Sequence, residues 1–324
     1  MYYVIVNPSS KSGRGLQIWK ELEPLFSRKN IEYQVFYSEK AGHVSQLVEN
    51  VCHSALGENP DIMIKLIILG GDGTFNEALQ GITDFEHVQI GYIPTGSSND
   101  LARDLKLKGS PAVLLEHILN CTTPFPMDLG CLTYNSNPTE FSRLHKEEFS
   151  KTRYFAVSCG IGYDAAICEE ALASRFKNFL NKIGCGKLTY VTIALKQLIV
   201  TKRGNCTITL DQNPPFTLNN FLFVASMIHQ YEGGGFMFCP KADYQDGVLD
   251  ICAVGPIAKL VILLALPSAL KGRHYKFPHI HAYKAKELRI DADRDFWVHT
   301  DGEVSVKSNS ISIKCLQNKI MLLK

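Results

Sequence analysis

The feature that most constrains this chain is residues 65–77, where a short apolar run leads into a glycine-rich turn and then a helical pattern. Residues 66–69 are all apolar, which predicts a strand buried on both faces. Three glycines follow within the next four residues. Glycines at such a turn let backbone N–H groups approach a phosphate, and the start of a helix adds partial positive charge. The stretch therefore predicts a strand, a phosphate-binding turn and a helix.

Asp72 stands among these glycines. A carboxylate beside a phosphate is unfavourable unless a cation lies between them, so the pattern predicts that Asp72 reaches toward Mg²⁺, directly or through water. The alternative is an ordinary turn in which Asp72 only stabilises the first turn of the helix.

Three further strands are predicted before residue 100, over residues 2–6, 33–37 and 89–93. Each is followed by a polar loop and then by an apolar pattern of helical period. Such alternation with short connections predicts a parallel, doubly wound α/β sheet, whose loops gather at the carboxyl ends of its strands. From about residue 124 onward, β-branched and aromatic residues alternate, which predicts a second, mostly antiparallel β domain.

Composition excludes several classes of protein. The formal net charge is only +2, so no general field favours nucleic acid. None of the ten cysteines forms a C-x-x-C pair, and most lie in apolar runs, which favours free thiols in a reducing cytoplasm. The longest apolar run, residues 260–270, contains Pro267 and is too short to span a bilayer.

Two pairs of acids stand in the second half of the chain. Asp243 and Asp246 precede a glycine and a predicted strand, where two carboxylates and a backbone carbonyl could surround one hard cation. Asp301 and Glu303 flank a glycine in a predicted hairpin, where a carboxylate could accept the proton of an alcohol. The alternatives are an Asp-Gly turn without metal and a charged hairpin tip.

The segment Gly-Gly-Asp-Gly-Thr of residues 70–74, together with Pro-Thr-Gly-Ser-Ser-Asn-Asp of residues 94–100, resembles the diacylglycerol kinase catalytic-domain family. The bacterial soluble lipid kinases of that family are the most similar in length and motif order. Nicotinamide-dinucleotide kinases and phosphofructokinases share the first motif but not the second in this form. Ser97 stands where the family usually has threonine, which keeps the hydroxyl group.

The resemblance implies a fold and a set of roles. It implies an ATP-binding α/β domain over residues 1–129 with the C-terminal segment 310–324, and a β-sandwich lipid-substrate domain over residues 130–309. Glu303 becomes the general base with Asp301 as its supporting acid, and Asp128 joins the metal network beside Asp72. The implied nucleotide-binding residues are Asn7, Ser38, Gly70, Gly71, Asp72, Gly73, Thr74, Asn76, Glu77, Thr95, Gly96, Ser97, Asn99 and Asp100. A structural Mg²⁺ would be held by Asp243, Asp246 and the carbonyl of Val248.

The implied activity is an ATP-dependent lipid kinase that phosphorylates the hydroxyl of diacylglycerol to give phosphatidate. A sphingoid base, a monoacylglycerol, or a non-catalytic role in binding nucleotide or lipid remain alternatives. A cytoplasmic protein that meets the inner face of the membrane transiently is expected. Two basic segments are candidates for that contact, residues 163–201 and 271–276. The sequence assigns no role to the polar residues 134–151 and leaves the oligomeric state open, a homodimer included.

Overall fold

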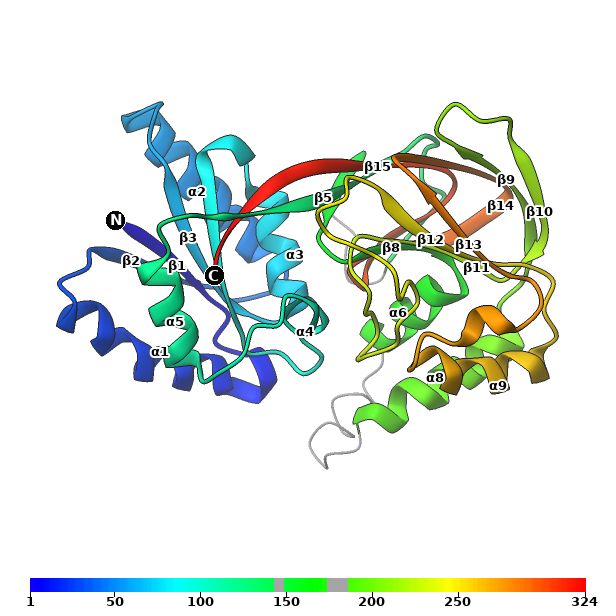
Figure 1. Ribbon diagram of the computed structural model, residues 1–324, viewed down its shortest axis with the longest axis horizontal. Coiled ribbons are helices and arrows are strands. Elements are labelled where there is room, and N and C mark those ends of the chain that lie inside the picture. Colours follow the sequence, from blue (N-terminus) through cyan, green and yellow to red (C-terminus); the bar gives the residue numbers. More distant parts are fainter. Residues whose placement is uncertain (143–148, 174–185) are drawn as a thin grey trace.

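The computed structural model describes residues 1–142, 149–173 and 186–324, and it shows two parts joined by two long strands (Figure 1). Segments 143–148 and 174–185 lie outside the described residues, and with them parts of the polar 134–151 segment and of the basic 163–201 segment. Within the described residues, no helix is both long and apolar enough to cross a membrane.

The first part is a parallel sheet in the strand order β2-β1-β3-β4. Its strands are β1 (Tyr2–Val6), β2 (Tyr33–Tyr37), β3 (Ile64–Gly70) and β4 (Val88–Pro94). Its helices are α1 (Ser10–Arg28), α2 (His43–Glu58), α3 (Asp72–Gly81), α4 (Asp100–Asp104) and α5 (Pro111–Asn120), with a short 3-10 turn η1 (Phe85–His87). The predicted doubly wound α/β fold is confirmed.

Alternate residues of the central strands feed two apolar layers, because neighbouring side chains of a strand point to opposite faces. Val4 and Ile67 pack with Trp19 of α1 on one face. Ile5 and Ile68 pack with the helices α2 and α3 on the other. The loops that follow β1 and β3 are therefore each supported by a buried strand.

The second part is built from antiparallel pairs, as predicted. Its strands are β6 (Glu140–Phe141), β7 (Thr152–Phe155), β8 (Ser158–Gly162), β9 (Gly204–Leu210), β10 (Phe216–Phe221), β11 (Phe223–Met227), β12 (Leu249–Val254), β13 (Ile280–Ala285) and β14 (Glu287–Thr300). Its helical elements are α6 (Tyr163–Ala173), α8 (Gly186–Val200), α9 (Lys259–Ala269) and η2 (His274–Lys276).

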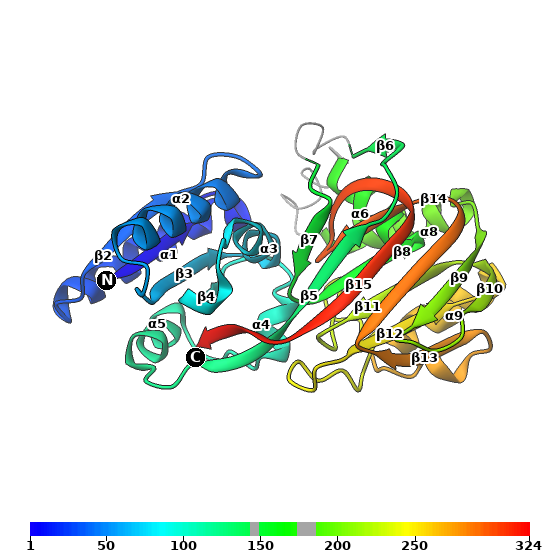
Figure 2. The same cartoon turned by 90° about the horizontal axis from the view of Figure 1, so that it is seen from above.

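Two strands connect the parts, β5 (Phe125–Tyr134) and β15 (Glu303–Leu323), which run side by side (Figures 1 and 2). Strand β15 begins against β14 and ends parallel to β4, where Met321 pairs with Gln89. The strand has an irregularity before Ile320, where Asn318 has a φ of 53°. One strand thus joins the hairpin at residue 303 to the first sheet.

Candidate active site

Two glycine turns from neighbouring strands form one backbone surface at the carboxyl end of the parallel sheet. A Cβ atom on Gly71 would lie 3.1 Å from the Cα of Gly96, and one on Gly96 would lie 2.7 Å from the Cα of Gly71. The Thr95 N–H donates to the Gly70 carbonyl at 2.7 Å. Only glycines allow this close approach, so the two motifs predicted from the sequence are brought together in space.

Polar side chains line the same edge. The Asn7 amide donates to the Thr74 hydroxyl at 3.0 Å, and the hydroxyls of Ser10 and Thr95 are 2.6 Å apart. The Asn99 side chain closes its own loop, accepting the Gly96 N–H at 3.0 Å and donating to the Gly96 carbonyl at 3.1 Å.

The remaining loop residues lie at or near the same strand ends. The Ser38 N–H donates to the Val6 carbonyl, which places Ser38 beside the end of β1, and Ser97 is exposed. These hydroxyl and amide groups can hydrogen-bond the phosphates and ribose of a nucleotide.

Asp72 begins helix α3, and neutral groups donate hydrogen bonds to its carboxylate. Its carboxylate accepts the Asp100 N–H at 2.9 Å and the Tyr92 hydroxyl at 3.3 Å. Burial raises the pKa of Asp72 to about 6, and the negative charges of Asp100 and Asp301 add to that rise. A carboxylate in this state is stabilised by a nearby cation, so the residues present suit Mg²⁺ at this position.

Asp100 links the two parts of the molecule. It pairs with Arg103 on its own helix, and its other oxygen accepts the Gly234 N–H at 2.6 Å. Arg103 in turn lies over the ring of Tyr231, with 5.4 Å between its Cζ and the ring centroid. Burial raises the pKa of Asp100, and the two contacts counter that rise. The sequence did not indicate Arg103, because its partners on residues 231–235 are far away along the chain.

The predicted Asp-Gly-Glu hairpin joins β14 to β15. Asp301 and Gly302 have φ values of 52° and 84°, which suits the two central residues of a tight hairpin turn. The Asp301 carboxylate accepts three consecutive backbone N–H groups, those of Ala156, Val157 and Ser158, at 2.8–2.9 Å. Burial raises the pKa of Asp301, and these bonds counter the rise. Asp301 therefore anchors the turn that carries Glu303.

Glu303 lies against the glycine turn of the first part. A Cβ atom on Gly73 would be 2.8 Å from the Glu303 Oε1 atom. The Asn76 amide on the next turn of α3 also donates to Asp301 at 2.8 Å. The two halves of the predicted site, 230 residues apart in sequence, therefore meet across the junction between the parts.

Two of the residues predicted to bind nucleotide, Asn76 and Glu77, make hydrogen bonds within the protein. Asn76 is 0% exposed, and its side chain bonds Asp301, the Tyr154 carbonyl and Arg153, so it holds the two parts together. The carboxylate of Glu77 accepts the Val44 N–H at the start of α2.

Asp128, which was expected in the metal network with Asp72, is held by backbone groups from two distant segments. Its two oxygens accept the N–H groups of Gly247 and Asn318, each at 2.7 Å. It therefore fastens the 243–248 turn to the irregular point of β15. Burial raises the pKa of Asp128, and these two hydrogen bonds counter the rise.

A lysine of β13 places its ammonium group at the turn that was predicted to hold a structural ion. The Lys284 ammonium lies 3.0 Å from Asp246 and 2.9 Å from Asp250. Asp243 and Asp246 are both exposed, and each accepts a backbone N–H within the turn. Across residues 1–142, 149–173 and 186–324, no group of three or more His, Cys, Asp or Glu side chains is arranged to hold a metal. A hard cation at this turn would have to share Asp246 with Lys284.

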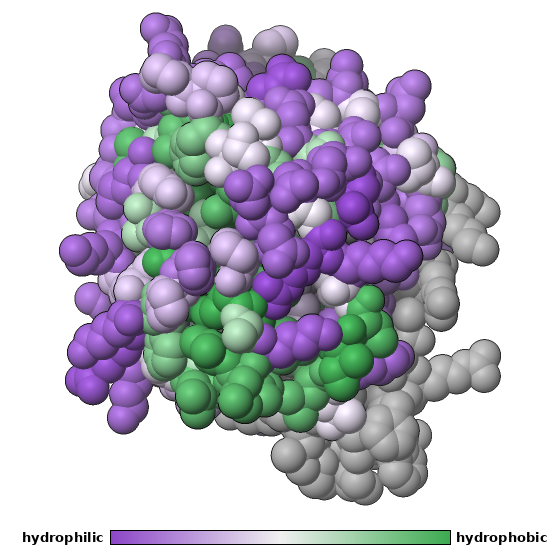
Figure 3. All heavy atoms as spheres, turned by 90° about the vertical axis from the view of Figure 1, so that its right-hand side faces the viewer, coloured by the Kyte–Doolittle hydropathy of each residue, from purple (hydrophilic) through white to green (hydrophobic). Residues whose placement is uncertain are grey.

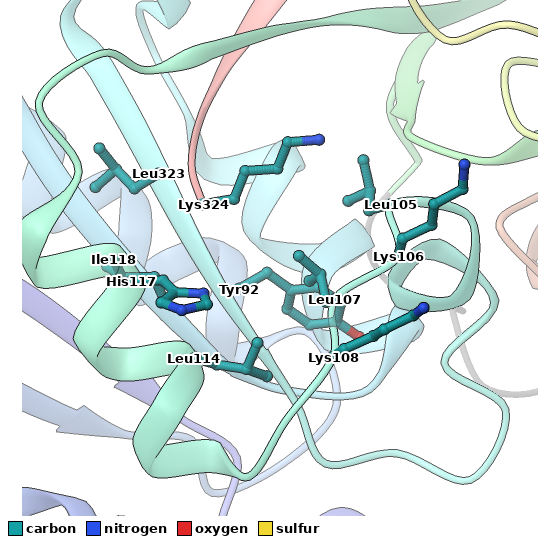
Figure 4. A pocket seen from close by; sticks show the side chains of 10 residues that line it. All are labelled: Tyr92, Leu105, Lys106, Leu107, Lys108, Leu114, His117, Ile118, Leu323 and Lys324. Atoms are coloured by element: carbon teal, nitrogen blue, oxygen red, sulfur yellow. The ribbon is translucent and has the colours of Figure 1, made fainter.

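A surface pocket lies elsewhere on the first part. It is lined mainly by residues of the α4–α5 region and the chain end, and three lysines stand at its rim (Figure 4). Neither Asp72 nor Glu303 lines it. Tyr92 connects the two places, since its ring lines the pocket and its hydroxyl reaches Asp72.

Two family models match the chain. The diacylglycerol kinase catalytic domain matches residues 1–131, and the YegS C-terminal NAD kinase beta sandwich-like domain matches residues 157–323. The two models follow one another along the chain and together span most of it. The chain therefore belongs to the diacylglycerol kinase catalytic-domain family, a family of lipid kinases, as the sequence motifs predicted.

Similar proteins support this assignment. YtlR of Bacillus subtilis strain 168, which carries a lipid-kinase name, is 26% identical over 94% of this chain and 93% of its own length. A Staphylococcus aureus diacylglycerol kinase is 25% identical over 94% of this chain and 86% of its own length. The crystal structure of a putative diacylglycerol kinase from Bacillus anthracis matches with a TM-score of 0.71 at 21% identity, covering 99% of this chain and 94% of that one. At that identity the structural match shows the fold.

Proposed function

We propose that this protein is an ATP-dependent kinase that phosphorylates the hydroxyl of diacylglycerol to give phosphatidate. The observation that carries the proposal is the position of Glu303, whose carboxylate lies against Gly73 in the glycine turn. A base within reach of a phosphate-binding surface is what transfer of a phosphoryl group to an alcohol requires.

The proposed reaction uses the two turns as follows. The backbone N–H groups of residues 70–74 and 95–97 hold the phosphates of ATP beside Asp72. Glu303 accepts the proton of the acceptor hydroxyl, the new P–O bond forms to that oxygen, and the bond to the departing ADP breaks. Mg²⁺ bound near Asp72 would neutralise charge on the phosphates. Asp301 and Asn76 keep Glu303 opposite the turn through their 2.8 Å hydrogen bond.

A lipid acceptor fits the surface of the second part. Apolar side chains gather at one end of the face in Figure 3, where Figure 1 places α8 and α9. Leu260 and Leu264 of α9 are 70% and 63% exposed, and Ile199 of α8 is 71% exposed. Single exposed leucines are ordinary, but a cluster on adjacent helices favours contact with an apolar partner.

The charge around this cluster favours an anionic lipid surface as that partner. No Asp or Glu stands anywhere from residue 251 to 286, whereas Lys271, Arg273 and Lys276 in that stretch are exposed. Basic residues beside exposed leucines suit a membrane with anionic lipids. Of the earlier candidates, Lys196 pairs with Glu170, and residues 175, 177 and 182 lie outside the described residues. The proposal therefore includes transient contact with the inner face of the membrane from the cytoplasm.

The alternatives concern the acceptor. A sphingoid base or a monoacylglycerol would use the same base and phosphate turns, because neither turn recognises the acyl chain. A regulator that binds nucleotide or lipid without transfer would leave Glu303 and Asp72 without a chemical role.

The test is phosphoryl transfer from γ-labelled ATP to each lipid separately, in the same detergent and at the same molar fraction. We expect labelled phosphatidate from diacylglycerol at a rate at least tenfold above that for the other lipids. Faster transfer to a sphingoid base or monoacylglycerol would replace the substrate. Transfer to no lipid would contradict the kinase proposal.

A further inference from the structure

A cluster of buried ionisable side chains lies directly behind the hairpin that carries Glu303. His299 is 0% exposed, and its Nε2 atom lies 3.3 Å from Asp164 Oδ2 and 3.3 Å from Glu232 Oε1. The three residues come from the end of β14, the start of α6 and the loop after β11. Ionisable groups buried together are costly unless they are paired and hydrogen-bonded, so the partners of each group in this cluster matter.

The other nitrogen of His299 holds the hairpin. Its Nδ1 atom accepts the N–H of Gly302 at 3.2 Å. Nδ1 must carry a lone pair to accept this bond, so the ring carries its proton on Nε2, between the two carboxylates. The carboxylates thereby fix both the ring orientation and the tautomer, and the ring fixes Gly302.

Strand β8 approaches the His299 ring so closely that only glycine fits at position 160. His299 pairs across strands with Gly160 of β8. A Cβ atom on Gly160 would collide with both Asp164 Oδ2 and His299 Nε2. The ring is therefore confined by its strand partner as well as by its hydrogen bonds.

The cluster is also connected to the phosphate side of the site. Glu232 belongs to a tight turn in which it exchanges two backbone hydrogen bonds with Phe236. Within that turn, the Gly234 N–H donates to Asp100, whose own N–H donates to Asp72. One short loop thus contacts the acids of the first part at one point and His299 at another.

We propose that His299 is a positioning residue for Glu303. Held by Asp164 and Glu232, it fixes Gly302 and so fixes the direction in which the Glu303 carboxylate points. Its role in turnover rests on the proposed kinase activity, whereas its hold on the hairpin does not.

Two substitutions separate the two ends of the ring. In His299→Asn, the side-chain oxygen falls near the place of Nδ1 and can still accept the Gly302 N–H. In His299→Gln, the side-chain nitrogen reaches toward the place of Nε2 and leaves Gly302 without that acceptor. Each is combined with Glu232→Gln, which removes one buried negative charge in both members of the pair, and Glu232→Gln alone is the control.

We expect kcat to fall between about 10-fold and 100-fold in the Gln variant, because a small misplacement of a reacting group has effects of this size. The Asn variant should stay within about fivefold of the control, and KM for ATP and for the lipid should change less than threefold in both. Equal losses of kcat in the two variants, or a change confined to KM, would overturn the proposal. Full activity of the Gln variant would overturn it as well.

A second readout does not depend on catalysis. We expect hydrogen exchange at the Gly302 amide to be at least tenfold faster in the Gln variant than in the Asn variant. Equal exchange rates would overturn the role of His299 even if the enzyme were fully active. The expected difference in an enzyme that phosphorylates no lipid would support the positioning role and contradict the kinase proposal alone.

Discussion

Gly73→Ala tests the contact on which the site depends, because it places a methyl group between the two parts. Gly73 lies in the first turn of α3, outside the region of positive φ, so alanine suits its backbone. The new Cβ would lie 2.8 Å from the Glu303 Oε1 atom, whereas ordinary contact begins at 3.4 Å. The carboxylate must therefore move by about 0.6 Å, which the flexible glutamate side chain allows at little cost in stability.

The expected result separates stability from activity. Alanine in place of glycine within a helix stabilises by up to about 1 kcal/mol, so the melting temperature should stay or rise. Displacement of the base should lower kcat between about 10-fold and 100-fold, and KM for ATP reports separately on any effect of the methyl group on phosphate binding. Thermal unfolding and steady-state transfer of label from ATP measure the two quantities.

A matched control exists on α2. A Cβ atom on Gly57 would meet no atom within 4 Å, so Gly57→Ala should share the gain in stability and keep full activity. Full activity of Gly73→Ala would refute the reasoning, because Glu303 would then not act from the position described. If Gly73→Ala failed to fold while Gly57→Ala folded, the claim that the Glu303 side chain can move at little cost in stability would be refuted.

Three further predictions concern charge and surface. Burial raises the pKa of Asp72 from 3.8 to about 6, so its ionised form costs the metal-free fold up to about 3 kcal/mol, a penalty that appears as pH rises through this range. Asp72→Asn should abolish turnover yet melt higher than wild type at pH 8 in chelator, with no difference at pH 4; a lower melting temperature at pH 8 would contradict this. Lys284→Met should make the melting temperature depend more strongly on Mg²⁺ than in wild type, since the ammonium leaves Asp246; an equal or smaller Mg²⁺ response would show that the two cations do not compete. The double variant Leu260→Ser, Leu264→Ser should sediment at least tenfold less with phosphatidylglycerol vesicles while keeping its activity on a short-chain soluble diacylglycerol, and unchanged sedimentation would exclude this surface.

The sequence predicted the elements whose signals are local. Strands Tyr2–Val6 and Tyr33–Tyr37 were placed with the bounds that the structure has, because each is a short run of residues that favour strands and is bounded by polar loops. The glycine turn and the Asp-Gly hairpin were also visible, since each needs glycine or a residue tolerant of positive φ at a fixed place.

The sequence could not show which partner each polar side chain chooses across the fold. Asn76 lies in the phosphate motif by sequence, yet it turns inward and binds Asp301, 225 residues away. Asp128 stands near the start of the second part, and its carboxylate accepts the N–H groups of Gly247 and Asn318, 119 and 190 residues away in sequence. His299 lies two residues before Asp301, but its role depends on acids in two distant segments. Such contacts are set by strand pairing between remote segments, for which a single sequence carries no local signal.

The chemical step in Glu303→Gln tests the central claim most directly. The substitution keeps the shape of the side chain and removes its capacity to accept a proton. Binding of Mg²⁺-ATP, measured by calorimetry, should stay within about threefold of wild type, while the single-turnover rate of phosphoryl transfer to diacylglycerol should fall by about 10²- to 10⁴-fold. An unchanged rate of transfer with normal ATP binding would contradict the account, because the proton of the acceptor would then leave by another route.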